Sequence, residues 1–188
     1  MPKPRLREFD RQLRSETAPK LANYDFVPGD HRTFRRVVPH EGTVSTQIIE
    51  FQVGTKSFSG MFTVNLGVFN PEYTPKPLPA QTDEPHSYDC LFDLLSKRLG
   101  FLRTPRTTLL DRLLGRRPIA EDYWWKQHAD ARSMKNELAD VEQLLLTDGL
   151  EWLRDHTSLC ALHSALEILE WRKRRLSTSD LENPPRGS

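Results

Sequence analysis

Two stretches of alternating apolar and polar residues flank a short glycine-containing segment, and this pair constrains the fold more than any other feature of the chain. The stretches cover residues 44–53 and 58–69, and Gly54-Thr55-Lys56-Ser57 lies between them. Alternation with period two predicts strands with one buried face, and a four-residue connection that starts with glycine predicts a hairpin loop. The chain should therefore contain an antiparallel sheet.

The register of this hairpin follows from placing Val53 opposite Phe58 across the loop. Because side chains alternate between faces, one face is then mostly apolar and should belong to the core. Its large residues are Ile49, Phe51, Phe62 and Val64. The opposite face is polar, and we expect these side chains to lie within two residue pairs of one another on it: Glu50, Gln52, Thr63 and Asn65. Such a division is typical of an antiparallel sheet covered on one side.

The segments before the hairpin add a helix and a strand. Residues 4–15 place apolar side chains at spacings of three and four, which predicts a short amphipathic helix that ends before Pro19. Residues 33–38 predict a first strand that ends at Pro39. This strand fits two registers equally well, so the pattern assigns neither Arg35 nor Arg36 to a face.

The second half of the chain has helical periodicity. Apolar residues recur at helical spacing, and glycines follow several of these stretches as end signals. The predicted helices cover residues 88–99, 108–114, 118–128, 131–147 and 158–176. Before them, residues 71–85 hold five prolines and predict a long loop. The tail, residues 177–188, is polar and predicts disorder.

These elements together predict one α+β domain over residues 1–176. It has an N-terminal helix, an antiparallel β-meander of three or more strands, and a helical C-terminal half packed on one face of the sheet. The longest apolar run, residues 159–162, is too short to cross a membrane. The first ten residues are charged where a secretory signal would be apolar. Since two cysteines cannot form a disulfide framework, we expect a cytoplasmic protein with no membrane contact.

No motif in the sequence assigns a reaction. It contains no phosphate-binding loop, dinucleotide fingerprint, nucleophile elbow or set of kinase motifs. Side chains of the zinc-ligand type fall into two local pairs, His86 with Cys90 and Cys160 with His163. We interpret both cysteines as packing residues, because free cysteine is often buried and a buried thiol without a nearby cation is unreactive. The sequence therefore predicts no metal, no cofactor and no catalytic residue.

Three groups of residues suggest binding surfaces. The first is the polar face of the sheet. The second is the pair Trp124 and Trp125, of which one should pack in the core while a neighbouring aromatic is partly exposed, as at protein interfaces. The third is residues 97–117, where seven cations stand against one acid. Such a patch suits a phosphate backbone or an acidic protein, but a net charge of +1 argues against a nucleic-acid partner.

Four motifs follow one another in the chain: IIEFQVGTKSFSGMFTVNLGVF, KRLGFL, the tryptophan pair and LTDGLEWLRD. In order and spacing they resemble a bacterial family known as domain of unknown function 4304, over residues 5–170. The resemblance implies an α+β domain that begins with a helix and a β-meander. It implies no activity, cofactor or catalytic residue. The matching polar positions are Gln52, Asn65 and Arg98, whereas residues 103–122 extend the family pattern.

These observations leave three functional hypotheses, and whether the protein is an enzyme stays open. The leading one is a non-enzymatic accessory protein, for example an immunity protein, that binds another protein through an exposed tryptophan. The second is a small-molecule-binding protein or hydrolase-like enzyme that uses the polar sheet face. The third is a nucleic-acid binder through residues 97–117. A deep pocket lined by Gln52 and Asn65 would favour the second, a continuous positive surface the third, and an exposed tryptophan patch the first.

Overall fold

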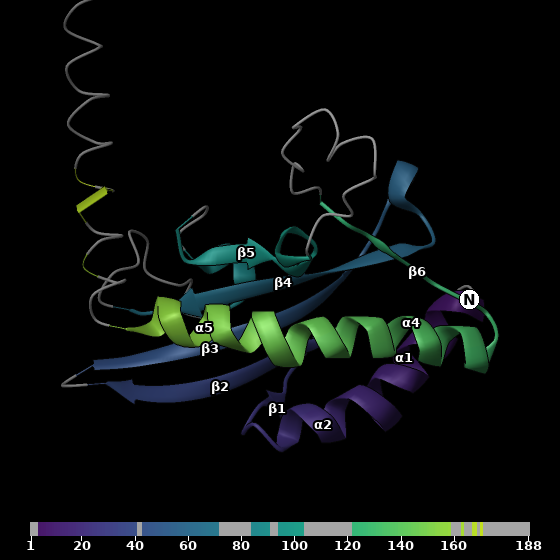
Figure 1. The fold of residues 1–188 in the computed structure, drawn as a ribbon, viewed down its shortest axis with the longest axis horizontal. Helices are drawn as coiled ribbons and strands as arrows, with labels where there is room; N and C mark the ends of the chain where they lie inside the picture. Colours follow the sequence, from purple (N-terminus) through teal and green to yellow (C-terminus); the bar gives the residue numbers. More distant parts are fainter. Residues whose placement is uncertain are drawn as a thin grey trace, which may run out of the picture.

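The computed structural model of the chain describes residues 4–40, 43–71, 84–90, 94–103, 122–158, 163, 167, 168 and 170. Within them, a six-stranded antiparallel sheet has the order β1-β2-β3-β4-β5, and the short β6 also pairs with β4. The strands are β1 (Val27–Pro28), β2 (Thr33–His40), β3 (Thr43–Val53), β4 (Met61–Phe69), β5 (Ser96–Arg98) and β6 (Trp125–Lys126). The helices are α1 (Pro4–Gln12), α2 (Ala18–Ala22), α4 (Ala131–Leu144) and α5 (Leu150–Thr157). They cover one face of the sheet, which confirms the predicted α+β fold (Figure 1).

The N-terminal helix is longer than predicted, because it passes through Pro19. α1 continues through a π-helical turn at Leu13–Thr17 into α2. Pro19 lies in the first turn of α2, where a missing N–H is tolerated, and the wider turn before it gives its ring room. Phe9, Leu13 and Leu21 are buried on this helical run.

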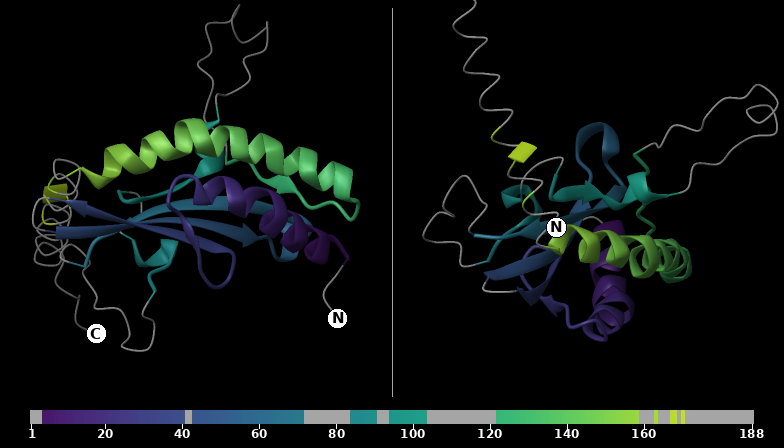
Figure 2. Two further views of the ribbon diagram at one scale, coloured as in Figure 1. Left: turned by 90° about the horizontal axis from the view of Figure 1, so that it is seen from below. Right: turned by 60° about the vertical axis from the view of Figure 1, so that its left-hand side comes forward.

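α4 and α5 form one long helical run across the sheet (Figure 2), joined by a second π-helical turn at Leu145–Gly149. The predicted helix end at Gly149 is therefore wrong. The glycine instead permits close packing, since a Cβ atom there would lie 3.0 Å from both Leu145 Cδ1 and Leu99 Cδ1. The apolar residues that recur at helical spacing in the predicted helix 131–147 are buried on one side of this run: Met134, Leu138, Val141 and Leu145.

The hairpin pairs in a different register from the predicted one. Val53 faces Phe62 rather than Phe58, a shift of four residues. The connection is longer because it contains a 3₁₀ turn at Lys56–Phe58 and a reversal at Gly60, whose φ of +87° favours glycine. Since the shift is even, every side chain keeps its predicted face. The four predicted core residues are all buried: Ile49, Phe51, Phe62 and Val64.

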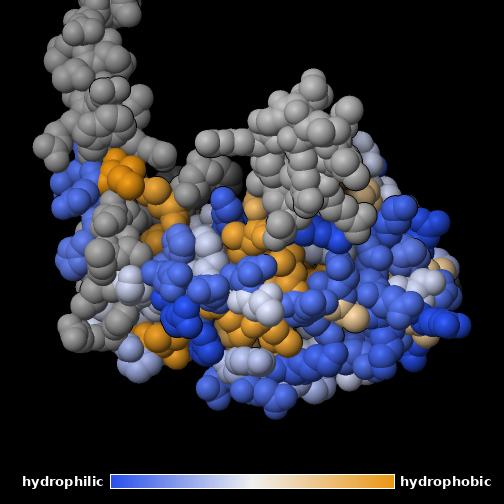
Figure 3. Space-filling model, viewed as in Figure 1, coloured by the Kyte–Doolittle hydropathy of each residue, from blue (hydrophilic) through white to orange (hydrophobic). Residues whose placement is uncertain are grey.

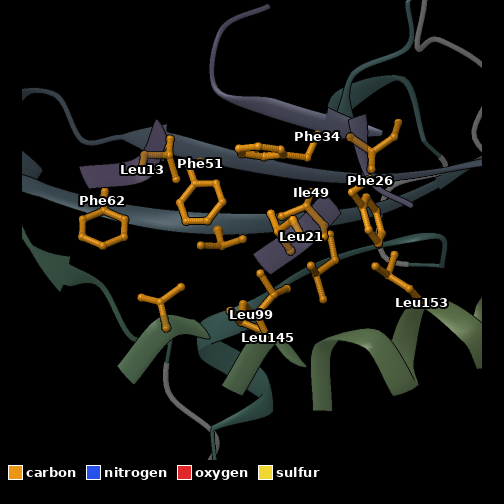
Figure 4. Close-up of a cluster of buried hydrophobic side chains, with 14 of the residues drawn as sticks. Leu13, Leu21, Phe26, Phe34, Ile49, Phe51, Phe62, Leu99, Leu145 and Leu153 are labelled. Carbon is orange, nitrogen blue, oxygen red and sulfur yellow. The ribbon is translucent and has the colours of Figure 1, made fainter. Parts of the chain in front are cut away.

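The core lies between the helices and one face of the sheet (Figure 4). Aromatic rings dominate its centre: the ring centroids of Phe9 and Phe62 are 4.7 Å apart, and those of Phe62 and Trp125 are 6.1 Å apart. Figure 3 shows that the outer surface on this side is mostly hydrophilic, with apolar side chains gathered around the long helix. Because helices fill this face, a site on the sheet has to lie on the other face.

β2 runs through Pro39 to His40 and places the two arginines that the sequence left unassigned. Arg35 lies opposite Ile48, on the face away from the helices. Arg36 lies opposite Gln47 on the helix face, and its guanidinium carbon stands 4.7 Å from the centre of the Phe26 ring. Of the two, only Arg35 therefore lies on the open face of the sheet.

Two of the predicted helices are wrong where the structure describes them. Residues 87–89 form a 3₁₀ turn, residues 96–98 form β5, and residues 99–102 form another 3₁₀ turn. The described part of 118–128 contains β6. In both places the chain pairs with the edge of β4, and these hydrogen bonds override a helical pattern of leucines or tryptophans.

Other predicted elements lie wholly or mostly outside the described residues. These are the helix at 108–114, the proline-rich loop at 71–85, the helix at 158–176 and the tail at 177–188. Cys160 and the cations from Arg106 to Arg117 also lie outside them.

Candidate functional site

The open face of the sheet carries the polar side chains that the sequence singled out. Glu50 lies opposite Asn65, and Gln52 lies opposite Thr63, on β3 and β4. Arg98 of β5 lies opposite Asn65 from the other side. Because residues opposite each other share a face, the true register brings the four positions on β3 and β4 closer together than the predicted one, and Arg98 of β5 lies beside them.

Residues 84–90, here called the cover segment, lie over part of this face. Ser87 donates two hydrogen bonds to Glu50 Oε2, from its backbone N at 3.2 Å and from its hydroxyl. Cys90 packs over Gly67, where a Cβ atom would lie 2.6 Å from the Cys90 Sγ. Glu50 is therefore partly buried and bonded, whereas Gln52 is exposed.

Arg35 anchors the other end of the cover segment. Its Nε donates to the Pro85 carbonyl at 2.7 Å, and its guanidinium also binds the carboxylates of Glu84 and Asp30. Burial by itself raises the pKa of Asp30, but the hydrogen bond from Arg35 and the charges around it outweigh burial, so this pKa lies below its ordinary value. The cover segment is thus tied to β2 and β3 by charged groups.

Tyr88 projects from the cover segment. One face of its ring stacks on the buried His86, with centroids 5.0 Å apart and planes 8° from parallel, while 72% of the residue is exposed. Burial, followed by the charges of Asp89 and Glu50, raises the pKa of Tyr88. Its phenol therefore stays protonated at neutral pH and can donate a hydrogen bond.

A cleft of about 610 Å³ lies between the cover segment, the strands and the turn after β5. Its lining combines amides, hydroxyls, cations and aromatic rings. The lining residues are Gln52, Asn65, Ser87, Tyr88, Ser96, Lys97, Arg98 and Phe101. No carboxylate is among these described residues, and of the two lining cations Arg98 pairs with Asp122, so Lys97 is the one that can attract a negatively charged group.

Arg98 connects the cleft to Trp124. Its guanidinium pairs with Asp122 and lies 5.4 Å from the centre of the Trp124 ring. Trp124 in turn donates from Nε1 to Asp122 and stacks on Phe58, with centroids 4.5 Å apart. Trp124 is partly buried and lies beside the cleft rather than in its lining.

The structure therefore brings together only some of the predicted site residues. Gln52, Asn65 and Arg98 line the cleft, and Glu50 holds one of its walls in place. Thr63 is fully buried and Trp125 is a core residue whose Nε1 donates to Asp140 at 2.8 Å. The remaining lining residues were missed, because a helix predicted over 88–99 does not place Tyr88, Ser96 and Lys97 on the sheet.

Among the described lining residues, the hydroxyl of Ser87 contacts a carboxylate, and a hydroxyl beside a carboxylate is the arrangement of a nucleophile and a base. The same carboxylate oxygen also accepts the backbone N–H of Ser87. Both bonds attach the cover segment to β3, so we assign Ser87 and Glu50 a structural role.

Cys90 packs as predicted. It is buried, and burial first, then the charges of Asp89 and Glu50, raises the pKa of its thiol well above the ordinary value. Among the described residues, no three side chains of His, Cys, Asp or Glu are placed to hold a metal ion.

The basic stretch 97–117 is described only as far as Arg103. Arg98 pairs with Asp122, and Arg103 lies 3.5 Å from an Asp140 carboxylate oxygen and 4.0 Å from the centre of the Tyr123 ring. Lys97 makes no ion pair within the described residues. In this part of the stretch, both arginines are thus matched by acids.

The chain matches no protein-family model, no curated protein and no solved structure. The resemblance to family 4304 accordingly rests on the four sequence motifs alone. None of the helices in the described part of the chain has the length and apolar character needed to span a membrane.

Proposed function

We propose that the protein binds a small anionic molecule with a planar heteroaromatic ring, such as a nucleotide, in the cleft. The observation that carries this proposal is the set of side chains around about 610 Å³: an amide pair, two cations and two aromatic rings. A concave site of this size with a few polar groups is typical of small-molecule binding. A cleft lined by Gln52 and Asn65 is also the feature that favours the second sequence hypothesis.

The amide pair supports recognition of a ring edge. Asn65 Nδ2 donates to Gln52 Oε1 at 3.0 Å. This bond leaves Gln52 Nε2 as a donor and Asn65 Oδ1 as an acceptor, and neither bonds to another described residue. A donor beside an acceptor complements the edge of a nucleobase, in the way that Asn and Gln side chains recognise adenine.

A cation and an aromatic ring of the cleft support recognition of the anionic group of the ligand and of the face of its ring. Lys97 is exposed, and its ammonium lies 5.5 Å from the centre of the Phe101 ring, so it is available to an anionic group. Tyr88 rests on His86 and presents an otherwise exposed ring for stacking. Stacking of a base on an aromatic side chain contributes about 1–3 kcal/mol.

The test is a calorimetric titration with AMP, adenosine and ribose 5-phosphate at low salt. Lys97→Gln should weaken AMP about fivefold, since a charge-assisted contact at an exposed site contributes about 1 kcal/mol. Tyr88→Leu should weaken AMP by about fivefold or more through lost stacking. Adenosine lacks the phosphate and should be insensitive to Lys97→Gln, while ribose 5-phosphate lacks the base and should be insensitive to Tyr88→Leu.

Lys126→Gln is the matched control, because Lys126 is an exposed cation on β6 that does not line the cleft. It should leave AMP binding unchanged. If Lys126→Gln and Lys97→Gln weaken AMP equally, the attraction is a general charge effect. That result, or the absence of AMP binding, would refute the proposal.

A protein partner is the second candidate, and the Phe58–Trp124 stack favours it. Phe58 is 43% exposed and Tyr123 is 40% exposed, so aromatic surface is present beside the cleft. The titration separates the two candidates, because a surface that binds only a protein leaves AMP unbound.

A further inference from the structure

A second surface adjoins the cleft along one edge of β4, with which β5 and β6 both pair (Figure 1). Trp125 of β6 lies opposite Phe62 and is buried in the core. Because side chains alternate along a strand, its neighbours in the chain, Trp124 and Lys126, have side chains on the open face of the sheet. Phe58 reaches the same place from the β3–β4 connection and stacks on Trp124. We call Phe58, Trp124 and Lys126 the β6 surface.

Arg98 joins the β6 surface to the cleft. It lines the cleft, and its guanidinium carbon lies 5.4 Å from the centre of the Trp124 ring. Asp122 pairs with this guanidinium and also accepts a hydrogen bond from Trp124 Nε1, which holds both side chains in place. A ligand that is longer than one nucleotide can therefore contact the cleft and the β6 surface together.

Exposed aromatic rings are present at both ends of this combined surface. Tyr88 is exposed in the cleft and rests on His86. Phe58 is exposed on the β6 surface and rests on Trp124, with ring planes 29° apart. A ring that is supported on one face and open on the other can stack on a base, and stacking tolerates any base because every base has such a face.

Exposed cations accompany the rings. Lys97 lines the cleft, and Lys126 lies opposite Met61 on the β6 surface. Both lysines are exposed, and neither makes an ion pair with a described residue. Cations placed along a row of aromatic rings are typical of proteins that bind single-stranded nucleic acids. The net charge of +1 argues against a polyanion held by many phosphate contacts, whereas a short single strand needs only a few.

We infer that the cleft and the β6 surface together bind a single-stranded oligonucleotide. One nucleotide occupies the cleft, the next base stacks on Phe58, and the phosphate of that second nucleotide contacts Lys126. The inference rests on the proposed function, because it extends the ligand of the cleft from one nucleotide to a strand. A protein could also cover these rings, but the nucleotide site beside them favours an oligonucleotide.

The test compares AMP with 5′-phosphorylated triadenylate, in its ribose and deoxyribose forms, by calorimetric titration of the full chain. At least one form should bind at least about fivefold more tightly than AMP, since stacking of a further base contributes at least about 1 kcal/mol. Phe58→Leu should weaken that trinucleotide about fivefold, and its effect on AMP should be much smaller. Lys126→Gln should weaken the trinucleotide and lower the slope of log affinity against log salt by about 0.7, the value for one phosphate contact of a single strand.

Each variant has a matched control outside both surfaces. Tyr24→Leu changes an exposed ring between α2 and β1, and Arg7→Gln changes an exposed cation on α1. Losses of trinucleotide affinity in these controls that equal those in Phe58→Leu and Lys126→Gln would overturn the inference. AMP binding without tighter binding of either trinucleotide would also overturn it, as expected of a β6 surface that binds only protein, and would leave the proposed function standing. If neither AMP nor the trinucleotides bind, the proposed function fails and the inference fails with it.

Discussion

Replacing Glu50 should destabilise the protein more than a change on a solvated sheet face can. A solvated Glu50 would cost at most about 0.5 kcal/mol on change to alanine. Here, however, Glu50 accepts two hydrogen bonds from Ser87, which is only 7% exposed. Glu50→Ala leaves a buried N–H and a buried hydroxyl without acceptors, at about 1–3 kcal/mol for each such group. Because Glu50 itself is partly exposed, water compensates in part, and we expect a loss of about 2–3 kcal/mol.

A double-mutant cycle isolates the contact from other effects of each change. Ser87→Ala removes only the hydroxyl bond and should cost about 1–2 kcal/mol. In the double variant this bond is already absent, so the two losses should fall short of additivity by about 1 kcal/mol. Urea unfolding followed by tryptophan fluorescence measures all four proteins, since Trp125 reports on the core. Additive losses within about 0.3 kcal/mol, with Glu50→Ala itself near neutral, would refute the attachment of the cover segment to β3.

Three further predictions concern the core, the thiol and the long helix. Phe62→Ala should lower the free energy of unfolding by about 3–5 kcal/mol in urea titrations, since Phe62 is fully buried among aromatic rings. A near-neutral result would contradict the placement of Phe62 in the core. In a Cys160→Ser background, Cys90 should react with a thiol reagent slowly before denaturation and quickly after it. Because folding raises the pKa of Cys90, the unfolded thiol ionises first, and stability should fall above about pH 8.5 more steeply than in Cys90→Ala. Asp130 is the N-cap of α4, and the hydrogen bond from the backbone N–H of Ser133 lowers the pKa of its carboxyl. Asp130→Ala should therefore lower the free energy of unfolding at pH 7, and the difference in stability from wild type should vanish as the pH falls below about 4. A difference in stability that persists at lower pH would contradict a charged N-cap.

Side-chain alternation predicted the faces of the sheet but could not predict the pairing of its strands. Any even shift keeps Ile49 and Phe51 on the apolar face, so a pattern of period two permits several registers. The register depends on the loop, where Lys56–Phe58 forms a 3₁₀ turn and Gly60 adopts a positive φ. Neither the 3₁₀ turn nor the positive φ of Gly60 can be inferred from the hydrophobic periodicity of the sequence.

The helical predictions failed where a segment forms hydrogen bonds with the edge of β4 or packs against the core instead of forming or ending a helix. Leu95 and Leu99 have helical spacing, yet both are buried around a strand that pairs with β4. A glycine at position 149 is typical of a helix end, yet here it lies inside the helical run and permits close contact with the side chain of Leu99. The cleft could be predicted only in part for the same reason: Gln52 and Asn65 follow from alternation, whereas Tyr88 and Lys97 depend on a short edge strand.

The measurement that tests the binding proposal most directly is a ¹H–¹⁵N titration of the full chain with AMP, followed residue by residue. The cleft predicts saturable shifts at the backbone amides of Ser87, Tyr88 and the stretch from Ser96 to Phe101, together with the side-chain amides of Gln52 and Asn65. These resonances should shift in parallel and yield one dissociation constant, and Lys97→Gln should raise that constant about fivefold. Shifts that cluster away from these residues, or no saturable shift at about 10 mM AMP, a concentration that would half-saturate a site with only about 3 kcal/mol of binding free energy, would contradict nucleotide binding in the cleft.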